Sequence, residues 1–226
     1  MPSGWRKAII AVVALAVCFW WADGALYRFL HSYFNVNTRP VPYGMAFPHR
    51  VLRSAEDWGE NVYIILVLFA MWKLDRRKRS RVFCVVVAAL AATGVVEVLK
   101  RTIGRERPTL SEGRFVAHGL NSAGVSQSFP SGHTASAAAY SGAIASFYPP
   151  VRSACFAIAV GCGANRIWKE RHYLSDCLVG GWIGWAMARW MATGRRFRPF
   201  WDALDDRISV RPPPPALISP WSAKAA

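Results

Sequence analysis

The sequence has few cysteines and few charged side chains, and both shortages exclude classes of protein. Five cysteines occur among 226 residues. None forms a C-x-x-C pair, and all lie within or beside apolar segments. An odd number without paired spacing predicts neither a disulfide framework nor a zinc site. We expect small buried side chains at these positions, which are Cys18, Cys84, Cys155, Cys162 and Cys177.

Acidic residues are also scarce, since 13 Asp and Glu stand against 28 Lys and Arg, a formal net charge of +15. A basic chain suits either nucleic acid or an anionic lipid surface, so the placement of the charges has to decide. The composition is 53% hydrophobic and 18% charged, which is apolar for a soluble domain. The 11 tryptophans point the same way, because Trp concentrates at bilayer interfaces.

Six apolar segments divide the chain and predict an all-α fold, an integral membrane bundle of about six transmembrane helices. Several segments are shorter than the roughly 20 residues that cross a bilayer, so we expect the helices to extend into flanking polar residues. No small-residue cleavage site follows the first segment, which predicts a retained helix. The fourth is rich in Ala, Ser and Gly and suits close helix packing. The segments are 8–26, 61–74, 82–99, 134–148, 154–164 and 177–193.

The basic residues lie between the apolar segments and predict one orientation in the membrane. The turn after the second segment carries six basic residues against Asp75 alone, so the positive-inside rule places it in the cytoplasm. Counting helices from this turn brings both chain ends to the same side, and both are basic. We therefore expect a multi-pass inner-membrane protein in contact with the bilayer, and no nucleic-acid partner. The cytoplasmic basic residues are Arg6, Lys7, Lys73, Arg76, Arg77, Lys78, Arg79, Arg81, Arg195, Arg196 and Arg198.

Three segments, 27–60, 101–133 and 165–176, are left on the opposite side, and the last two are also basic. Charges that break the topology rule are candidates for binding an anion. Polar residues gather there at the predicted helix ends: Lys100, Arg107 and Pro108 after the third segment, Pro130, Ser131, Gly132 and His133 before the fourth, and Arg166, His172 and Asp176 between the fifth and sixth.

These three groups resemble the signature of the type 2 phosphatidic acid phosphatase (PAP2) superfamily, K-x6-R-P, P-S-G-H and S-R-x5-H-x3-D. The chain reads K-R-T-I-G-R-E-R-P from Lys100, P-S-G-H from Pro130 and N-R-I-W-K-E-R-H-Y-L-S-D from Asn165. Asn165 replaces the usual Ser, and an amide N–H can replace a hydroxyl as donor. Three motifs in the right order are a specific signal, and the resemblance covers residues 82–193.

The resemblance implies a role for each matched residue. Lys100, Arg107 and Arg166 would hold the phosphate. His172 would attack phosphorus, Asp176 would orient it, and His133 would protonate the leaving oxygen. We accordingly expect a phosphatase domain over residues 1–200, with its motif-bearing core at 82–193, and an irregular Pro-rich cytoplasmic tail at 201–226.

The residue types suit phosphoryl transfer on independent grounds. Charge develops on three phosphoryl oxygens, and cationic side chains stabilise it, so we expect no metal and no cofactor. Ser131 and Gly132 precede a helix, where backbone N–H groups bind anions. If the last helix includes His172, Asp176 lies four residues on along the same face. Its carboxylate would then fix the imidazole tautomer, as in catalytic triads.

The motifs indicate binding of a phosphate group but do not identify the lipid that carries it. Undecaprenyl diphosphate is our first choice, because its phosphate appears on the outer face in bacteria. Phosphatidylglycerol phosphate, phosphatidate and lipid A phosphates are its rivals. The same site could instead pass phosphate to another lipid. A soluble vanadate haloperoxidase is a third hypothesis, which the apolar segments disfavour. A catalytically silent membrane scaffold or transporter is a fourth, which the complete set of motifs disfavours. The oligomeric state cannot be read from the sequence.

Three smaller predictions concern residues outside the motifs. Glu97 lies inside an apolar segment, so we expect it to pair with a basic residue of the site. The aromatic and basic segment 27–60 would lie in the interface and border the lipid's entry path. The remaining charges of this side should form a solvated rim: Arg101, Arg105, Glu106, Lys169, Glu170 and Arg171. His31, His49 and His118 are expected to be solvated or interfacial.

Overall fold

A computed structural model describes residues 21–34, 62–121 and 127–210, together with residues 10, 13, 14 and 17. Its helices are α2 (Asp23–Phe34), α4 (Val62–Leu74), α5 (Ser80–Ile103), α6 (Pro108–Ser111), α7 (Gly132–Phe147), α8 (Arg152–Trp168), α9 (Leu174–Thr193) and α10 (Arg198–Ile208), with short 3-10 turns at Gly119–Asn121 and Pro149–Val151. The described residues contain no strand, only one isolated bridge between Arg105 and Ala117.

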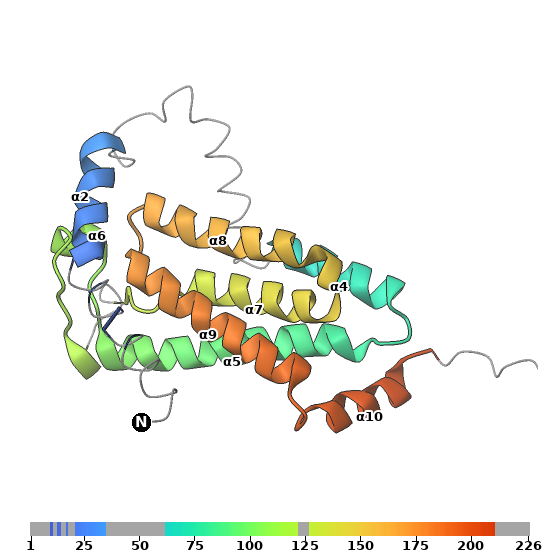
Figure 1. Ribbon diagram of the computed structural model, residues 1–226. Helices are drawn as coiled ribbons and strands as arrows, with labels where there is room; N and C mark the ends of the chain where they lie inside the picture. Colours follow the sequence, from blue (N-terminus) through green and yellow to red (C-terminus); the bar gives the residue numbers. More distant parts are fainter. Residues whose placement is uncertain are drawn as a thin grey trace, which may run out of the picture.

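Helices α5, α7, α8 and α9 run side by side and form the bundle (Figure 1). Helix α7 packs against the other three, and most of its residues are buried. Its Ala, Ser and Gly side chains let neighbouring backbones approach closely. The contact with α9 is especially close, because a methyl group at Gly184 would overlap the carbonyl oxygen of Ala135.

Large apolar side chains point outward from the bundle. Leu90 on α5 is 67% exposed and Trp182 on α9 is 71% exposed. Helices that are apolar on both the inner and the outer face are typical of a bilayer environment. Within the described residues, one helix, Ser80–Ile103, is long and apolar enough to cross a membrane, and Tyr63–Leu74 is a shorter apolar helix.

Five of the six predicted helices appear as α4, α5, α7, α8 and α9, and the all-helical class is confirmed. Helices α5 and α8 extend beyond their apolar segments into polar residues, as expected. The first predicted segment, 8–26, is described only in part, at residues 10, 13, 14, 17 and 21–26, and residues 35–60 of the proposed entry segment, which include His49, lie outside the described residues. The count of six membrane spans therefore stays a prediction.

The tail differs from the prediction. Residues 201–208 were expected to be irregular and instead belong to helix α10. Asp205 explains the order, because its buried carboxylate accepts a hydrogen bond from the Ser80 N–H at 2.8 Å and lies 3.3 Å from Lys78 Nζ. A carboxylate is favourable at the N-terminus of α5, where backbone N–H groups lack intrahelical partners. The Pro-rich part, 211–226, lies outside the described residues.

The four cysteines that the structure describes, Cys84, Cys155, Cys162 and Cys177, are buried and free, as the sequence predicts. The helix connections place all three motifs at one end of the bundle. Helices α5 and α8 end there, α7 and α9 begin there, and α2 lies across this end (Figure 1). Helix α10 and the turn between α4 and α5 lie at the opposite end.

Candidate active site

The first motif is positioned by the C-terminus of α5. Gly104 adopts a left-handed conformation with φ of 60° and donates its N–H to the Lys100 carbonyl, which ends the helix as Gly commonly does. Lys100 Nζ lies 2.9 Å from Glu97 Oε1. The predicted pairing of Glu97 with a basic residue of the site is therefore confirmed.

The second motif begins helix α7. Ser131 caps the helix by accepting the Thr134 N–H, and its own N–H donates to the Asp176 carbonyl at 3.0 Å. A Cβ added to Gly132 would lie 3.3 Å from Lys100 Nζ, so the first two motifs meet here. His133 lies in the first turn of α7 and is partly exposed.

His172 lies in the loop before α9 and is 4% exposed. Its Nδ1 lies 2.7 Å from the backbone carbonyl oxygen of Ser128. A carbonyl oxygen can only accept, so Nδ1 carries the proton and Nε2 of the neutral ring carries a lone pair. The helix starts at Leu174 and does not include His172.

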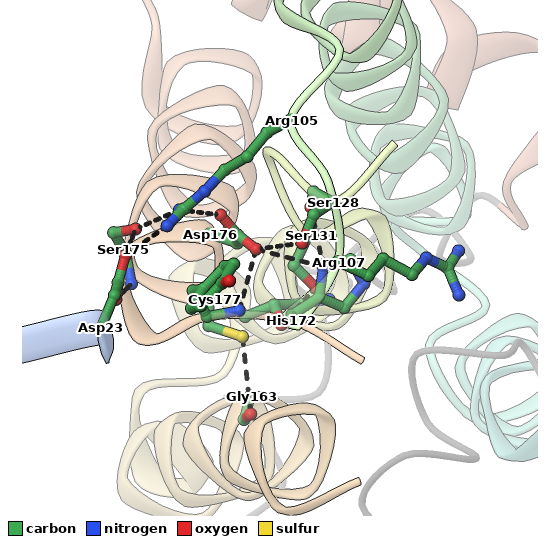
Figure 2. Close-up of polar contacts among 12 residues, drawn as sticks. Asp23, Arg105, Arg107, Ser128, Ser131, Gly163, His172, Ser175, Asp176 and Cys177 are labelled. Carbon is green, nitrogen blue, oxygen red and sulfur yellow. Dashed lines mark hydrogen bonds and ion pairs between the residues drawn. The ribbon is translucent and has the colours of Figure 1, made fainter. Parts of the chain in front are cut away.

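Asp176 lies in the first turn of α9 and is fully buried. One oxygen, Oδ2, accepts the Tyr173 N–H at 2.9 Å and the Ser128 hydroxyl at 2.5 Å, and it lies 3.6 Å from His172 Nδ1. That last distance is an ion-pair distance and too long for a hydrogen bond. The expected direct tautomer control by Asp176 is therefore corrected: the carbonyl of Ser128 does it, and Asp176 holds that serine (Figure 2).

The environment keeps His172 uncharged. Burial is the largest influence and lowers its pKa below the ordinary value near 6.5; the nearby Asp176 opposes this, and the charge of Arg166 adds to it. A neutral imidazole with a free lone pair is the nucleophilic form.

Three arginines lie near one another, and one of them, Arg166, acts on His172. The pKa of Arg107 is lowered first by burial and then by the like charges of Arg171 and Arg166. Arg166, in the last turn of α8, is 8% exposed. Arg107 is partly exposed and Arg171 is exposed, and guanidinium groups brought close together in this way favour binding an anion between them. Asn165, the departure from the family pattern, is fully buried in α8.

An apolar hollow of about 460 Å³ lies next to this site on helices α8 and α9. Its outer walls include Phe156 and Trp182, and its inner end reaches Thr134 and Leu174. Thr134 is hydrogen-bonded to Ser131, so the hollow borders the second motif.

The predicted solvated rim is wrong for two of its members. Arg105 is 1% exposed and Glu170 is 2% exposed, and each has a partner of opposite or complementary charge. Arg105 binds Asp176 Oδ1 at 2.6 Å, and Glu170 binds His31 at 3.1 Å. Arg101 and Arg171 are exposed, and Glu106 and Lys169 are partly exposed. His118 is about half exposed and binds Glu106.

Sequence reasoning missed four residues that support Asp176: Asp23, Arg105, Ser128 and Ser175. A signal existed for Asp23, since it is a carboxylate within an apolar segment, the same feature that singled out Glu97. Ser128 and Ser175 carried no signal beyond lying beside motif residues. Among the residues that the structure describes, no group of three or more His, Cys, Asp or Glu is arranged to hold a metal ion.

The chain belongs to the PAP2 superfamily, whose sequence model matches residues 81–200. The match contains all three motifs, helices α6 to α9 and all of α5 except Ser80.

Curated relatives narrow the comparison within that family. A lipid A 1-phosphatase from Rhizobium etli is 32% identical over 148 residues, which cover 56% of this chain and 64% of the relative. A second lipid A 1-phosphatase, from Rhizobium johnstonii, is 31% identical over 145 residues, covering 58% of this chain and 59% of the relative. The chain thus spans less than two thirds of the length of these relatives.

Two solved structures share the fold. A transmembrane PAP2-type phosphatidylglycerolphosphate phosphatase from Bacillus subtilis has a TM-score of 0.56 at 18% identity. The match covers 92% of this chain and 98% of the Bacillus chain. LpxE from Aquifex aeolicus has a TM-score of 0.52 at 19% identity, covering 74% of this chain and 92% of its own. The helical bundle seen here is therefore the fold of membrane PAP2 proteins.

Proposed function

We propose that this protein removes a phosphate from a membrane lipid phosphate through a phosphohistidine intermediate on His172. The observation that carries the proposal is the state of His172: it is buried, its Nδ1 is hydrogen-bonded to a carbonyl, and it lies beside Arg166. An imidazole of this kind next to an anion site suits nucleophilic attack on phosphorus.

In the first half of the reaction, the lone pair on His172 Nε2 attacks phosphorus and the bond to the lipid oxygen breaks. Arg107, Arg166 and Lys100 stabilise the charge on the phosphoryl oxygens, assisted by the backbone N–H groups at the start of α7. His133 donates a proton to the leaving lipid oxygen. The imidazole becomes cationic as the new bond forms, and the Asp176 carboxylate 3.6 Å away stabilises it.

In the second half, water attacks the phosphohistidine and the P–N bond breaks. His133, now neutral, takes the proton from water, phosphate leaves, and His172 returns to its neutral form. Lys100, Arg107 and Arg166 stabilise the charge on the phosphoryl oxygens in both halves of the reaction, and the proposed mechanism uses no metal ion.

We propose lipid A phosphate as the first substrate to test, because both curated relatives are named lipid A 1-phosphatase. Undecaprenyl diphosphate, preferred on sequence grounds, becomes the second. The apolar hollow on α8 and α9 supports a lipid substrate of either kind, since it offers a hydrocarbon chain an apolar surface that leads to the second motif.

We further propose that the site faces the exterior of the inner membrane. The support is the basic turn at 75–81, which lies at the end of the bundle opposite to the site (Figure 1). Residues 1–200 would then form the functional unit, and the proline-rich segment would be cytoplasmic.

The decisive experiment measures phosphate release by purified protein in detergent with EDTA. The panel is lipid A, undecaprenyl diphosphate, phosphatidylglycerol phosphate and phosphatidate. Three proteins are compared: wild type, His172→Ala, and His118→Gln as a matched control at a half-exposed histidine. Wild type and the control should release phosphate, and His172→Ala should release none. An alkaline quench during turnover should leave phosphate bound to wild type and to the control but not to His172→Ala, because phosphohistidine survives alkali.

Release by folded His172→Ala at the wild-type rate would overturn the nucleophile assignment. Folded wild type that releases no phosphate from any lipid would overturn the hydrolase. In that case, phosphate found on an added second lipid would establish phosphotransfer from the same histidine.

A further inference from the structure

Three buried charged side chains, Asp176, Arg105 and Asp23, form a network of ion pairs behind the active site. Arg105 binds Asp176 Oδ1 at 2.6 Å and Asp23 Oδ2 at 2.8 Å. The three side chains are each about 1% exposed or less. Arg105 occupies one of the six unspecified positions of the K-x6-R-P motif, and Asp23 lies on α2, outside the segment that matches the family.

Hydrogen bonds through Ser175 link these charged side chains further. Ser175 donates its N–H to Asp23 Oδ1 at 2.9 Å and its hydroxyl to Oδ2, and Arg105 also donates to the Ser175 hydroxyl at 2.8 Å. The guanidinium lies over the Tyr173 ring at 3.9 Å from its centroid. A planar guanidinium clamped on two carboxylates and one aromatic face has a single orientation. Figure 2 shows Arg105 between Asp23 and Asp176.

Helix α2 is tied to the site at a second point. His31, two turns after Asp23, binds the buried carboxylate of Glu170 at 3.1 Å, and Glu170 lies two residues before His172. Helix α2 is thus held to both sides of the nucleophile, on one side through Arg105 and Asp176 and on the other through Glu170.

We propose that Arg105 and Asp23 are positioning residues of the reaction, which hold Asp176 and through it His172 in working geometry. This inference rests on the proposed phosphatase function. Arg105 occupies Oδ1 of Asp176, which leaves Oδ2 for Tyr173, Ser128 and His172. Ser128 in turn presents its carbonyl to His172 Nδ1. Asp23 keeps the guanidinium from turning away, because it compensates the remaining charge of Arg105.

Arg105 and Asp23 carry opposite charges, so removing each charge should change the proton affinity of the His172–Asp176 pair in opposite directions. This difference gives the proposal a distinctive test. The active form has neutral His172 and ionised Asp176. The elements that meet at this end of the bundle carry these charged or titratable groups: Asp23 on α2, Lys100 and Glu97 on α5, Arg105 and Arg107 after it, His133 on α7, Arg166 on α8, and Glu170 and Arg171 in the loop before α9. Removing the charge of Arg105 raises the proton affinity of the pair, whereas removing the charge of Asp23 lowers it.

The experiment records kcat/KM against pH in detergent for wild type and for Arg105→Met, Arg105→Lys, Asp23→Asn and the double variant Arg105→Met with Asp23→Asn. Asp205→Asn is the control, because Asp205 is a comparably buried carboxylate at the far end of α5. One lipid is used throughout, so titration of the substrate phosphate cancels between variants.

Arg105→Met should shift the acid limb to higher pH by about 1 pH unit or more, and Asp23→Asn should shift it to lower pH. The double variant should return toward the wild-type midpoint. Arg105→Lys keeps the charge and should keep the midpoint, while kcat falls by as much as about 100-fold through lost orientation. Asp205→Asn should leave the midpoint and kcat unchanged.

Loss of activity in Arg105→Met and Asp23→Asn with no movement of either midpoint would overturn the proposal and leave Arg105 and Asp23 a purely structural role. Midpoints that move in the same direction for Arg105→Met and Asp23→Asn would also overturn it. Both outcomes require an active wild type, so they differ from failure of the phosphatase function itself, in which wild type releases no phosphate. A variant too unstable to assay is replaced by Arg105→Gln or Asp23→Ser, with the same expected directions.

Discussion

At the scale of single residues, a backbone carbonyl decides which nitrogen of His172 is left without a proton. Ser128 supplies that carbonyl, and its hydroxyl is held by Asp176. The sequence placed Asp176 near His172 through their i, i+4 spacing, and the structure has them 3.6 Å apart. Spacing along one helix could not reveal Ser128, since the loop that carries it is brought beside His172 only by the packing of α7 against α9.

The lowered pKa of His172 predicts the pH dependence of the reaction. In the proposed mechanism the neutral ring is the reactive form, and burial lowers its pKa, so this form persists to a lower pH than for a solvated histidine. The acid limb of kcat/KM should therefore have its midpoint below 6.5, because this limb reports groups of the free enzyme. The measurement is a pH profile of phosphate release by wild type.

The substrate needs its own control in that profile, because a phosphate monoester titrates at about pH 6. Phosphorus NMR of the lipid in the same detergent gives its pKa, and the enzyme's limb is taken after correction for it. A corrected midpoint above 6.5 would contradict the environment described for His172.

Charged residues near the site are either buried with partners or exposed to solvent, and the sequence alone assigned only some of them correctly. Residues at motif positions and Glu97 were identified, because a fixed pattern or an apolar surrounding makes them conspicuous. Arg105 was taken for a rim residue because it stands in a run of charges, at 105–107. Its direction depends on Gly104, whose positive φ turns the chain so that Arg105 enters the protein and is buried at 1% exposure.

At the scale of elements, the contact between α7 and α9 holds the second and third motifs together. The Ser131 N–H donates to the Asp176 carbonyl, and the small residues of both helices keep their backbones close. The sequence predicted this packing for α7 from its Ala, Ser and Gly content. It could not identify the glycines of α9 that face α7, because Gly180, Gly181 and Gly184 look alike without the structure.

Gly184→Ala should destabilise the protein. The added methyl would overlap the Ala135 carbonyl oxygen and lie 2.9 Å from Ala139 N, and forced overpacking of this kind costs about 1–3 kcal/mol. Gly181→Ala is the matched control, since its methyl meets only Thr134 Cγ2 at 3.6 Å. Thermal unfolding in detergent should give a lower Tm for Gly184→Ala, and a Tm equal to or above wild type for the control. Equal Tm values for all three proteins would show that the two helices are not packed as described.

At the scale of the whole molecule, the two ends of the bundle differ in what they carry. One end bears the motifs and α2, and the other bears the basic turn and α10 (Figure 1). The sequence predicted this division, because both motif order and charge distribution follow from counting helices. The helical order of residues 201–208 was missed, since it depends on a buried carboxylate from α10 that caps α5 far away in the chain.

Labelling of introduced cysteines tests the orientation of these ends. Leu120→Cys lies at the motif end and is 79% exposed as Leu, and Arg77→Cys lies in the exposed basic turn. A membrane-impermeant maleimide should label Leu120→Cys in intact cells, and Arg77→Cys only after permeabilisation. Wild type measures the background from the native cysteines. The reverse pattern would place the site in the cytoplasm.

The position of Asp23 limits how this enzyme can be rebuilt. Residues 81–200 carry every family motif, so they look like a portable module for chimeras. A graft of that segment would import Arg105 without its α2 carboxylate, and loss of one partner from a buried ion pair costs about 3–5 kcal/mol. A chimera that exchanges catalytic segments between relatives should therefore transfer Asp23 of α2 together with Arg105 in the loop that follows α5.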